Sequence, residues 1–442
     1  MSFNSRKNDR VLQIINVMLC IIAVIGAIVL SSYFIAEKTL LSPSTPADNT
    51  VAVINPIENT TAVTESINQS APTPTPMVIN ELLPEDPVVE NFFGPLPEVT
   101  STTPVERFTV HGLYVSYGVN LENNLDLIEQ TDLNAIVIDL KESWGVYFNT
   151  TNQQAADIGY IDPKYDLEAI CNECHERDIW VIGRIVCFKD PLLAEAYPDR
   201  AICDEDGNTL YFTTEGSQCF ANPYDTRNWN YLIDLALEAI SLGVDEIQFD
   251  YIRFPTGSTT TGAEPFFGEG EVPTRCQTIN RFLQTARRRI QDTYGVPVSA
   301  DIFGIAVTSS LDGELLGQDW ATVGFTGVDS LCPMLYPSHY ALGTILNGHE
   351  FEFPDKEPYD VIYNAMVVGS ASHNQPGYST VRPYLQAFTA YYIGAGRYLE
   401  YDYQAINDEI RAIQDSGDGS SEWILWNVEG LYPEGFYGGN AG

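Results

Sequence analysis

The spacing of hydrophobic residues changes at three points along the chain. Residues 1–10 are mostly polar, and residues 11–36 form an uncharged apolar run, long enough for a helix across a bilayer, which takes about 20 residues. Residues 37–106 are rich in Pro, Thr, Ser and Asn, lack helical or strand periodicity, and predict a disordered linker. In residues 107–442, short β-rich runs alternate with amphipathic helical stretches.

This alternation predicts an α/β fold of the (β/α)8 TIM-barrel type. Residues 225–242 carry apolar side chains at helical spacing behind Asp225, a plausible N-cap, and the helical stretch 274–294 has three arginines toward its C-terminal end. A doubly wound open sheet is the alternative, but no Gly-x-Gly-x-x-Gly motif follows the first strand. The eight strand-like runs are 109–118, 135–142, 180–188, 245–254, 297–305, 329–338, 381–388 and 422–429.

Basic residues precede the apolar run, whereas acidic residues dominate the chain after it. Arg6, Lys7 and Arg10 therefore place the N-terminus in the cytoplasm and everything after the span outside the cell membrane. A cleaved signal peptide is the alternative, although it would have a shorter apolar region, of about 7–15 residues, and a small-residue cleavage site. We therefore expect a single-pass membrane anchor that carries an extracytoplasmic domain.

The overall charge limits the partners of the protein. The formal net charge is −38, from 60 acidic and 22 basic residues, so the chain lacks the basic surface that nucleic-acid binding requires. We therefore expect no nucleic-acid partner.

The cysteines are expected to be structural. Seven of the eight lie beyond the apolar run, and an odd number cannot all pair within one chain. Cys203 and Cys219 flank one polar segment and are a candidate disulfide, whereas Cys187 and Cys332 lie in strand-like runs. The Cys-x-x-Cys-His pattern at 171–175 matches haem attachment, but it lies on a helical stretch beside the third strand. No metal or other cofactor is expected.

The stretch 243–255, Gly-Val-Asp-Glu-Ile-Gln-Phe-Asp-Tyr-Ile-Arg-Phe-Pro, carries the strongest functional signal. A parallel barrel strand is normally almost entirely apolar, so burying Asp250 costs several kcal/mol unless the carboxylate is paired or used. Pro255 ends the strand, which places Asp250 near its C-terminal end. Active sites of (β/α)8 enzymes are built at that end of the barrel.

Other strands also bring polar or aromatic side chains to this end, and the set suits glycoside hydrolysis. That reaction needs two carboxyl groups, and Asp250 and Asp301 lie on neighbouring strands about 4.8 Å apart, compatible with a retaining pair. Arg184 could lower the pKa of a neighbouring carboxyl group. The alternative is a buried polar network without chemistry. The candidate substrate-binding residues are Asp139, Arg184, Arg253, Tyr336, Gln386 and Trp426.

From about residue 107 to the C-terminus, the chain resembles the family of putative glycosyl hydrolase domains of exported bacterial proteins. The resemblance rests on Ile-Asp-Leu-Lys at 138–141, the blocks 182–191 and 245–255, Asn-Pro-Tyr at 222–224, and Arg-Pro-Tyr-Leu-Gln-Ala-Phe at 382–388. It implies a barrel that hydrolyses the glycosidic bonds of a polysaccharide or cell-envelope glycan.

A more distant resemblance is to chitinase-type barrels. Asp250 matches the aspartate motif of their fourth strand, Tyr336 their Met-x-Tyr and Trp426 their tryptophan, a sugar platform. The chitinase acid would stand at position 252, which holds Ile252. We therefore expect Asp250 to be the nucleophile or base and Asp301 the acid, with Glu142 the next candidate. A non-catalytic glycan-binding barrel, acting in envelope adhesion or as a scaffold, is the alternative.

Overall fold

The computed structural model describes residues 107–435 except 119, 269–271, 418–420 and 434, together with residue 105. The predicted cytoplasmic segment 1–10, the predicted membrane span 11–36 and nearly all of the linker 37–106 lie outside the described residues. Within the described part of the chain, no helix is both long enough and apolar enough to cross a membrane.

Eight parallel strands form a closed barrel. The ring closes because β1 pairs with both β2 and β12, so the sheet has no open edge among these strands. Each strand falls within one of the eight predicted runs, which confirms the (β/α)8 prediction and makes the open-sheet alternative wrong. In chain order the strands are β1 (His111–Ser116), β2 (Ala135–Glu142), β4 (Trp180–Val186), β5 (Glu246–Asp250), β6 (Val298–Phe303), β7 (Ser330–Met334), β11 (Tyr384–Gln386) and β12 (Trp423–Trp426).

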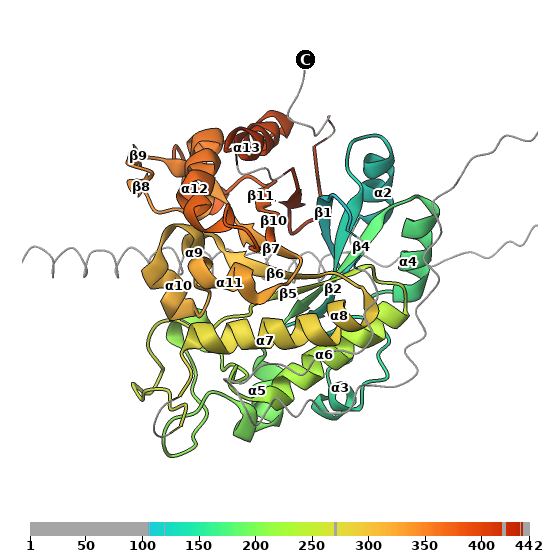
Figure 1. Cartoon of the computed structure of the whole chain (residues 1–442), viewed down its shortest axis with the longest axis vertical. Helices are drawn as coiled ribbons and strands as arrows, with labels where there is room; N and C mark the ends of the chain where they lie inside the picture. The colour runs from blue at the N-terminus through green and yellow to red at the C-terminus, as the bar shows by residue number, and fades with distance from the viewer. Residues whose placement is uncertain are drawn as a thin grey trace, which may run out of the picture.

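Helices follow the strands and surround the barrel (Figure 1). The longer ones are α2 (Leu121–Glu129), α4 (Leu167–Glu176), α6 (Thr226–Ser241), α7 (Arg275–Arg289), α12 (Pro358–His373) and α13 (Tyr403–Asp415). The shorter ones are α3 (Gln153–Ile158), α5 (Pro191–Ala196), α8 (Gln291–Tyr294), α9 (Gly304–Thr308), α10 (Ser310–Leu316) and α11 (Trp320–Val323). The remaining strands are β3 (Gly145–Val146), β8 (Thr344–Leu346), β9 (His349–Phe351) and β10 (Thr380–Val381).

Local sequence signals explain the ends of the two predicted helices. The Asp225 side chain caps α6 by accepting a hydrogen bond from the backbone N–H of Arg227, as predicted. Thr274 and Gln277 form a capping box that starts α7. The predicted helix 274–294 is two helices, α7 and α8, which meet at Ile290 with φ −108° and ψ −69°.

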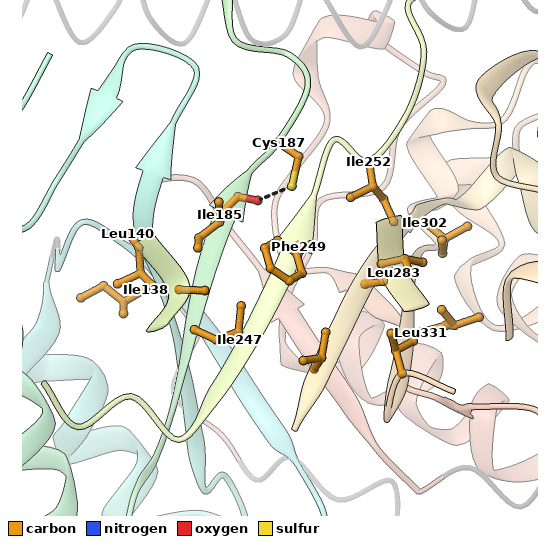
Figure 2. Close-up of a cluster of buried hydrophobic side chains, with 14 of the residues drawn as sticks. Ile138, Leu140, Ile185, Cys187, Ile247, Phe249, Ile252, Leu283, Ile302 and Leu331 are labelled. Atoms are coloured by element: carbon orange, nitrogen blue, oxygen red, sulfur yellow. Dashed lines mark hydrogen bonds between the residues drawn. The ribbon is translucent and has the colours of Figure 1, made fainter. Parts of the chain in front are cut away.

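Strand alternation divides the barrel into an outer and an inner layer. Outward-facing residues form one large apolar core between the strands and the helices. Figure 2 shows part of it, with side chains from β2, β4, β5, β6, β7 and α7 in contact. The inward-facing residues form a smaller cluster that is rich in tyrosine and is flanked by buried charges at both ends. The outer layer therefore stabilises the barrel and the inner layer is available for chemistry.

Two glycines allow close approach between neighbouring elements. A Cβ atom on Gly183 in β4 would lie 2.5 Å from the Cδ1 atom of Leu140 in β2. A Cβ atom on Gly304, where α9 begins, would lie 2.3 Å from the backbone carbonyl oxygen of Met334 in β7. Both distances are well below a van der Waals contact. At Gly304 the contact is with backbone, so this position requires glycine, whereas at Gly183 a larger residue would displace the Leu140 side chain.

The expected disulfide between Cys203 and Cys219 is wrong. All seven described cysteines are free, and the two thiols donate to different carbonyl oxygens, Cys203 to Pro198 and Cys219 to Pro191. The thiols nevertheless pack in one small apolar cluster, which explains why they flank the same segment. Cys187 and Cys332 are completely buried, as expected.

Candidate active site

Arg184, near the C-terminal end of β4, is the centre of the candidate site. Its guanidinium group is almost completely buried, and its planar fork matches the geometry of several carboxylates at once. Four carboxyl groups surround it: Asp139 at 2.5 Å, Glu142 at 2.6 Å, Asp250 at 2.6 Å and Asp301 at 3.8 Å. The structure thus brings together both predicted catalytic residues and two of the predicted substrate-binding residues.

Asp250 is held by three hydrogen bonds at the end of β5. Its Oδ2 atom accepts from Nε and Nη2 of Arg184 at 3.0 and 2.6 Å. Its Oδ1 atom accepts from the backbone N–H of Tyr251 at 2.5 Å. Charge-assisted bonds of this kind stabilise a carboxylate and fix its orientation.

Asp301, near the end of β6, has a different environment. Its side chain is 1% exposed, and its Oδ1 atom has no hydrogen-bond partner among the described residues. Burial, together with the negative charge of Asp250, raises the pKa of Asp301 well above the ordinary range of an aspartic acid, and the more distant Arg184 only partly opposes this. Asp301 is therefore suited to hold a proton that it can donate.

The two carboxyl groups are close enough to act on one bond. Nε of Arg184 lies 3.0 Å from Oδ2 of Asp250 and 3.8 Å from Oδ2 of Asp301, so these two oxygens lie no more than the sum, 6.8 Å, apart. Retaining glycosidases place their carboxyl groups about 5–5.5 Å apart, and inverting enzymes about 6.5–9.5 Å. A separation of at most 6.8 Å is compatible with a catalytic pair. Because this upper limit reaches the range of inverting enzymes, the distance is compatible with both retention and inversion at the anomeric carbon.

The backbone is strained where β1 and β5 reach the site. Ser116 and Tyr251 both have positive φ angles, 48° and 50°, which are uncommon for residues other than glycine. Both residues also contact the carboxyl groups, because the backbone N–H of Tyr251 donates to Asp250 and the Ser116 hydroxyl donates to Asp139 at 3.0 Å. Such strain is typical of functional sites.

Asp139 is engaged on both oxygens and positions Arg184. Its Oδ1 atom accepts from Arg184, and its Oδ2 atom accepts from the hydroxyl groups of Tyr114 at 2.6 Å and Ser116. Burial raises the pKa of Asp139, although Arg184 opposes the shift. Because both oxygens of Asp139 already have protein partners, these contacts favour a structural role in the buried polar network over direct contact with the substrate.

Glu142 is partly exposed and less suited than Asp301 to act as the acid. Burial raises the pKa of Glu142, but the charge and hydrogen bond of Arg184 and the backbone N–H of Ser143 outweigh it and hold the pKa below the ordinary value. A carboxyl group that ionises so readily is a weak proton donor near neutral pH.

An aromatic box lies beside the carboxyl groups. The ring of Trp426, at the end of β12, lies 5.9 Å from Tyr114, 5.7 Å from Tyr336 and 5.2 Å from Phe388. Burial, together with the charges of Asp301 and Asp250, raises the pKa of Tyr336 well above its ordinary value. The box offers apolar ring faces for a sugar next to the candidate catalytic pair.

Sequence reasoning missed Tyr114 and Phe388. Tyr114 lies on the inward face of β1, two residues from Gly112, so applying strand alternation to the first strand would have found it. Phe388 follows the end of β11 in an irregular segment, where no periodicity indicates which way a side chain points.

Arg253 is engaged away from Asp250. Its Nη1 and Nη2 atoms form a bidentate pair with Glu215 at 2.8 and 3.0 Å, and its guanidinium group lies 4.6 Å from the ring centre of Phe303. Glu215 belongs to the segment between α5 and α6. Because Phe212 and Phe220 of that segment are buried, packing accounts for these two aromatic residues.

Gln386 is also engaged by protein partners. Its Oε1 atom accepts from the backbone N–H of Ser338, and its Nε2 atom donates to Asp355 at 2.8 Å and to the carbonyl oxygen of Phe388. The side chain is completely buried. These contacts fix the loops after β7 and β11, so they indicate a supporting position for Gln386 at the rim of the site.

Ile252 does not occupy the site. Its side chain is completely buried in the outer apolar layer, beside Ile302 and Leu283 (Figure 2). A glutamate at this position would lie among apolar side chains at a cost of several kcal/mol. The chitinase acid is therefore absent from a position that, in this barrel, points away from Asp250.

The described part of the chain offers no candidate metal centre. Within the described residues, no three His, Cys, Asp or Glu side chains are grouped so that they could hold a metal ion. The Cys-x-x-Cys-His motif lies on α4, with Cys171 and Cys174 buried in the outer core and His175 bonded to Asp245 at 3.0 Å.

Comparison with solved structures gives low-similarity matches. One is a hypothetical protein from Ruminiclostridium thermocellum, 34% identical over 43% of this chain and 96% of that chain, with a TM-score of 0.37. An alpha-galactosidase from Thermus thermophilus is 11% identical over 74% of this chain and 59% of that chain, at a TM-score of 0.42. A GH18 chitinase from Pseudoalteromonas aurantia is 13% identical over 72% of this chain and 94% of that chain, at 0.41.

No curated protein matches the chain in sequence. The family model for the putative glycosyl hydrolase domain matches residues 110–432, which include all eight barrel strands and every residue around Arg184. The resemblance seen in the sequence motifs is thereby confirmed. The chain belongs to the family of putative glycosyl hydrolase domains, and its barrel is a glycoside hydrolase domain.

Proposed function

We propose that the barrel hydrolyses a glycosidic bond of a polysaccharide or cell-envelope glycan with Asp301 as the general acid and Asp250 as the nucleophile or base. The observation that carries the proposal is the contrast between two neighbouring carboxyl groups. Asp250 accepts two hydrogen bonds from Arg184, whereas Asp301 is buried with an unpartnered oxygen. Such a divergence between paired carboxyl groups separates acid from base in glycosidases.

The reaction follows from these environments. Asp301 protonates the glycosidic oxygen as the bond to the leaving sugar breaks, and positive charge develops at the anomeric carbon. Asp250, held by Arg184, either attacks that carbon or deprotonates a water molecule that attacks it. In the first case a glycosyl ester of Asp250 forms, and water hydrolyses it while the now deprotonated Asp301 takes up the proton of that water. Trp426 and Tyr336 offer ring faces to the sugar, and Arg184 and Asp139 keep the carboxylate in position.

Matched variants test the assignment. The full chain, purified in mild detergent, is incubated with a panel of envelope and environmental polysaccharides, and reducing ends are measured. Asp250→Asn and Asp301→Asn should each lower kcat by about a hundredfold or more, since nucleophile and acid act on the same bond. Asp329→Asn, at the N-terminal end of β7, is the control for changing a buried aspartate and should retain turnover.

The outcomes separate an enzyme from a binding module. Polysaccharide bound equally by the parent and both variants, with no reducing ends released, would favour the non-catalytic glycan-binding barrel. The anomer of the first product formed by the active parent distinguishes retention from inversion.

The location of the enzyme is part of the proposal. The basic residues before the apolar run 11–36 support an anchor with its N-terminus in the cytoplasm and the barrel outside. Expressed in a bacterial host, the full chain should sediment with membranes and be degraded by protease added to intact spheroplasts. A chain that sediments but resists the protease until the cells are lysed would contradict the orientation.

A further inference from the structure

Exposed aromatic side chains extend the candidate site beyond the barrel mouth. Trp144 is 55% exposed at the tip of the hairpin formed by β2 and β3, and Tyr117 is 37% exposed directly after β1. Tyr147, directly after β3, lies edge-on to Tyr117 with ring centres 5.9 Å apart. Trp144, Tyr117 and Tyr147 are called the aromatic rim below.

The aromatic rim is joined directly to the catalytic centre. Glu142 and Gly145 pair across the hairpin, so Trp144 is two residues from the carboxyl group that accepts a hydrogen bond from Arg184. At about 3.3 Å per residue, the two Cα atoms are within about 7 Å. A glycan bound at Asp250 and Asp301 therefore has the aromatic rim within reach of its neighbouring sugar units.

The hairpin that carries Trp144 is held rigidly. The backbone N–H of Tyr147 donates to the carbonyl oxygen of Leu140 at 2.8 Å, and that of Val146 donates to Tyr160 at 2.9 Å. The Glu142 side chain also accepts from the backbone N–H of Ser143, at the start of the turn. The indole therefore stands on a preformed support, which reduces the entropy lost when a ligand stacks on it.

The charges around the centre indicate the kind of glycan. Four carboxyl groups surround the single guanidinium group of Arg184. The neighbouring cations are each paired with a carboxylate: Lys141 with Asp190 at 2.8 Å, Lys189 with Glu215 at 3.6 Å, Lys164 with Asp162 at 2.5 Å, and Arg253 with Glu215 at 2.8 Å. A polyanionic glycan would meet net negative charge here, in a chain whose formal charge is −38.

We infer that the aromatic rim is a subsite for an uncharged glycan chain, with a sugar ring stacked on Trp144 while a neighbouring unit lies at Asp250 and Asp301. The inference rests on the proposed function, because it extends the same site. Sugar rings present C–H faces that pack on indole, and an uncharged chain avoids the repulsion that a polyuronate would meet. The enzyme thus holds several units of a neutral polymer.

Binding measurements on single-residue variants test the subsite. The full chain carrying Asp301→Asn, which prevents consumption of the ligand, is titrated calorimetrically with neutral hexasaccharides of glucose, xylose, mannose and N-acetylglucosamine, and with hexagalacturonate. Adding Trp144→Ala should weaken binding of the preferred neutral hexasaccharide up to about tenfold, as loss of one aromatic contact predicts. Trp144→Phe, which keeps a stacking face, should restore most of the affinity.

Phe325 provides the matched control. It is 43% exposed and lies directly before β7, at the opposite end of the barrel from the site, so Phe325→Ala removes an exposed aromatic side chain without touching the rim. This variant should bind the hexasaccharide as the parent does. Equal binding by the parent and Trp144→Ala, or tighter binding of hexagalacturonate than of every neutral hexasaccharide, would overturn the inference.

Failure of this inference is distinguishable from failure of the proposed function. Turnover of a neutral polymer with the same KM in the otherwise unmodified chain and in Trp144→Ala would sink the subsite and leave the hydrolase intact. Loss of hexasaccharide binding in Trp144→Ala, in a chain that releases no reducing ends, would support the subsite and sink the hydrolase.

Discussion

At the scale of single residues, the site depends on one guanidinium group that holds carboxyl groups in different protonation environments. Arg184 donates to Asp139, Glu142 and Asp250, but it only approaches Asp301. Asp301 is therefore the least compensated carboxyl group of the set. If this asymmetry controls catalysis, changes to Arg184 or to the charges around Asp301 should alter kcat or its dependence on pH.

Arg184→Lys should reduce kcat by at least about a hundredfold, because an ammonium group cannot bridge several carboxylates in the planar geometry of the guanidinium group. Arg382→Lys is the control. Arg382 is equally buried in the barrel interior and pairs with Glu246 at 2.6 Å and Glu422 at 3.0 Å, toward the N-terminal end. Both variants should lower the urea midpoint, but only Arg184→Lys should abolish turnover by the folded protein. Similar kcat values in the two variants would contradict the central role of Arg184.

The pH profile should report the raised pKa of Asp301. As the acid, Asp301 works while protonated, so kcat/KM should fall as pH rises through a pKa well above the ordinary value of about 3.9. The charge of Glu246 also helps to raise the pKa of Asp301. Glu246→Gln should therefore move the alkaline limb to lower pH, by less than about one unit. An unchanged or alkaline-shifted limb would argue against Asp301 as the acid.

At the scale of elements, buried ion pairs next to the candidate active site hold loops against the barrel. Glu215, in the segment between α5 and α6, reaches Arg253 after β5 and Lys189 after β4. The partners Arg253 and Lys189 outweigh burial and hold the pKa of Glu215 below its ordinary value. This contribution to stability is therefore present above pH about 4.3 and is lost as pH falls through the folded-state pKa.

A double-mutant cycle tests whether Arg253 stabilises the fold through Glu215 or binds the substrate. Arg253→Met alone leaves Glu215 with the more distant Lys189 as its remaining cation, and should cost about 3–5 kcal/mol of unfolding free energy in urea. Arg253→Met combined with Glu215→Gln should recover part of that loss because no unpaired charge remains. The double variant should keep the KM of the parent. A large increase in KM with stability restored would show that Arg253 contacts the substrate, as the sequence suggested.

At the scale of the whole molecule, buried titratable groups should make the barrel less stable in alkali. Burial raises the pKa of Glu409 on α13 well above its ordinary value, and its two oxygens accept hydrogen bonds from the Tyr401 hydroxyl group and from the backbone N–H of Gln386. The hydrogen bond to Asp245 raises the pKa of His175, which joins α4 to the base of β5. Both groups contribute stability below their unfolded pKa values, and that stability is lost as pH rises through the folded ones.

Measuring Tm at a series of pH values tests whether these groups make the barrel less stable in alkali. Tm should fall between about pH 5 and pH 9, and Glu409→Gln, which keeps the shape and removes the ionisation, should flatten the slope. Asp415→Asn is the control on the same helix, because Asp415 is exposed and lies at the last residue of α13, away from Glu409. It should leave the slope unchanged. A slope that is identical in the parent and Glu409→Gln would show that Glu409 does not control alkaline stability.

Local patterns in the sequence were enough to predict the eight strands, the helix capped by Asp225 and the polar residues at the strand ends. Periodicity, capping and strand alternation are local, and they placed Asp250, Asp301 and Arg184 on the inner face before any contact was known. Family membership, too, was readable from the motifs around these residues.

The partner that each of these residues meets depends on the packing of segments that are distant in the sequence. Arg184 collects carboxyl groups from three other strands, Arg253 turns to Glu215, Ile252 points into the outer core, and Cys203 and Cys219 remain unbonded. The physical reason is that burial and pairing depend on which distant segments exclude water around a group. That exclusion raises the pKa of Asp301, and strand periodicity carries no information about it.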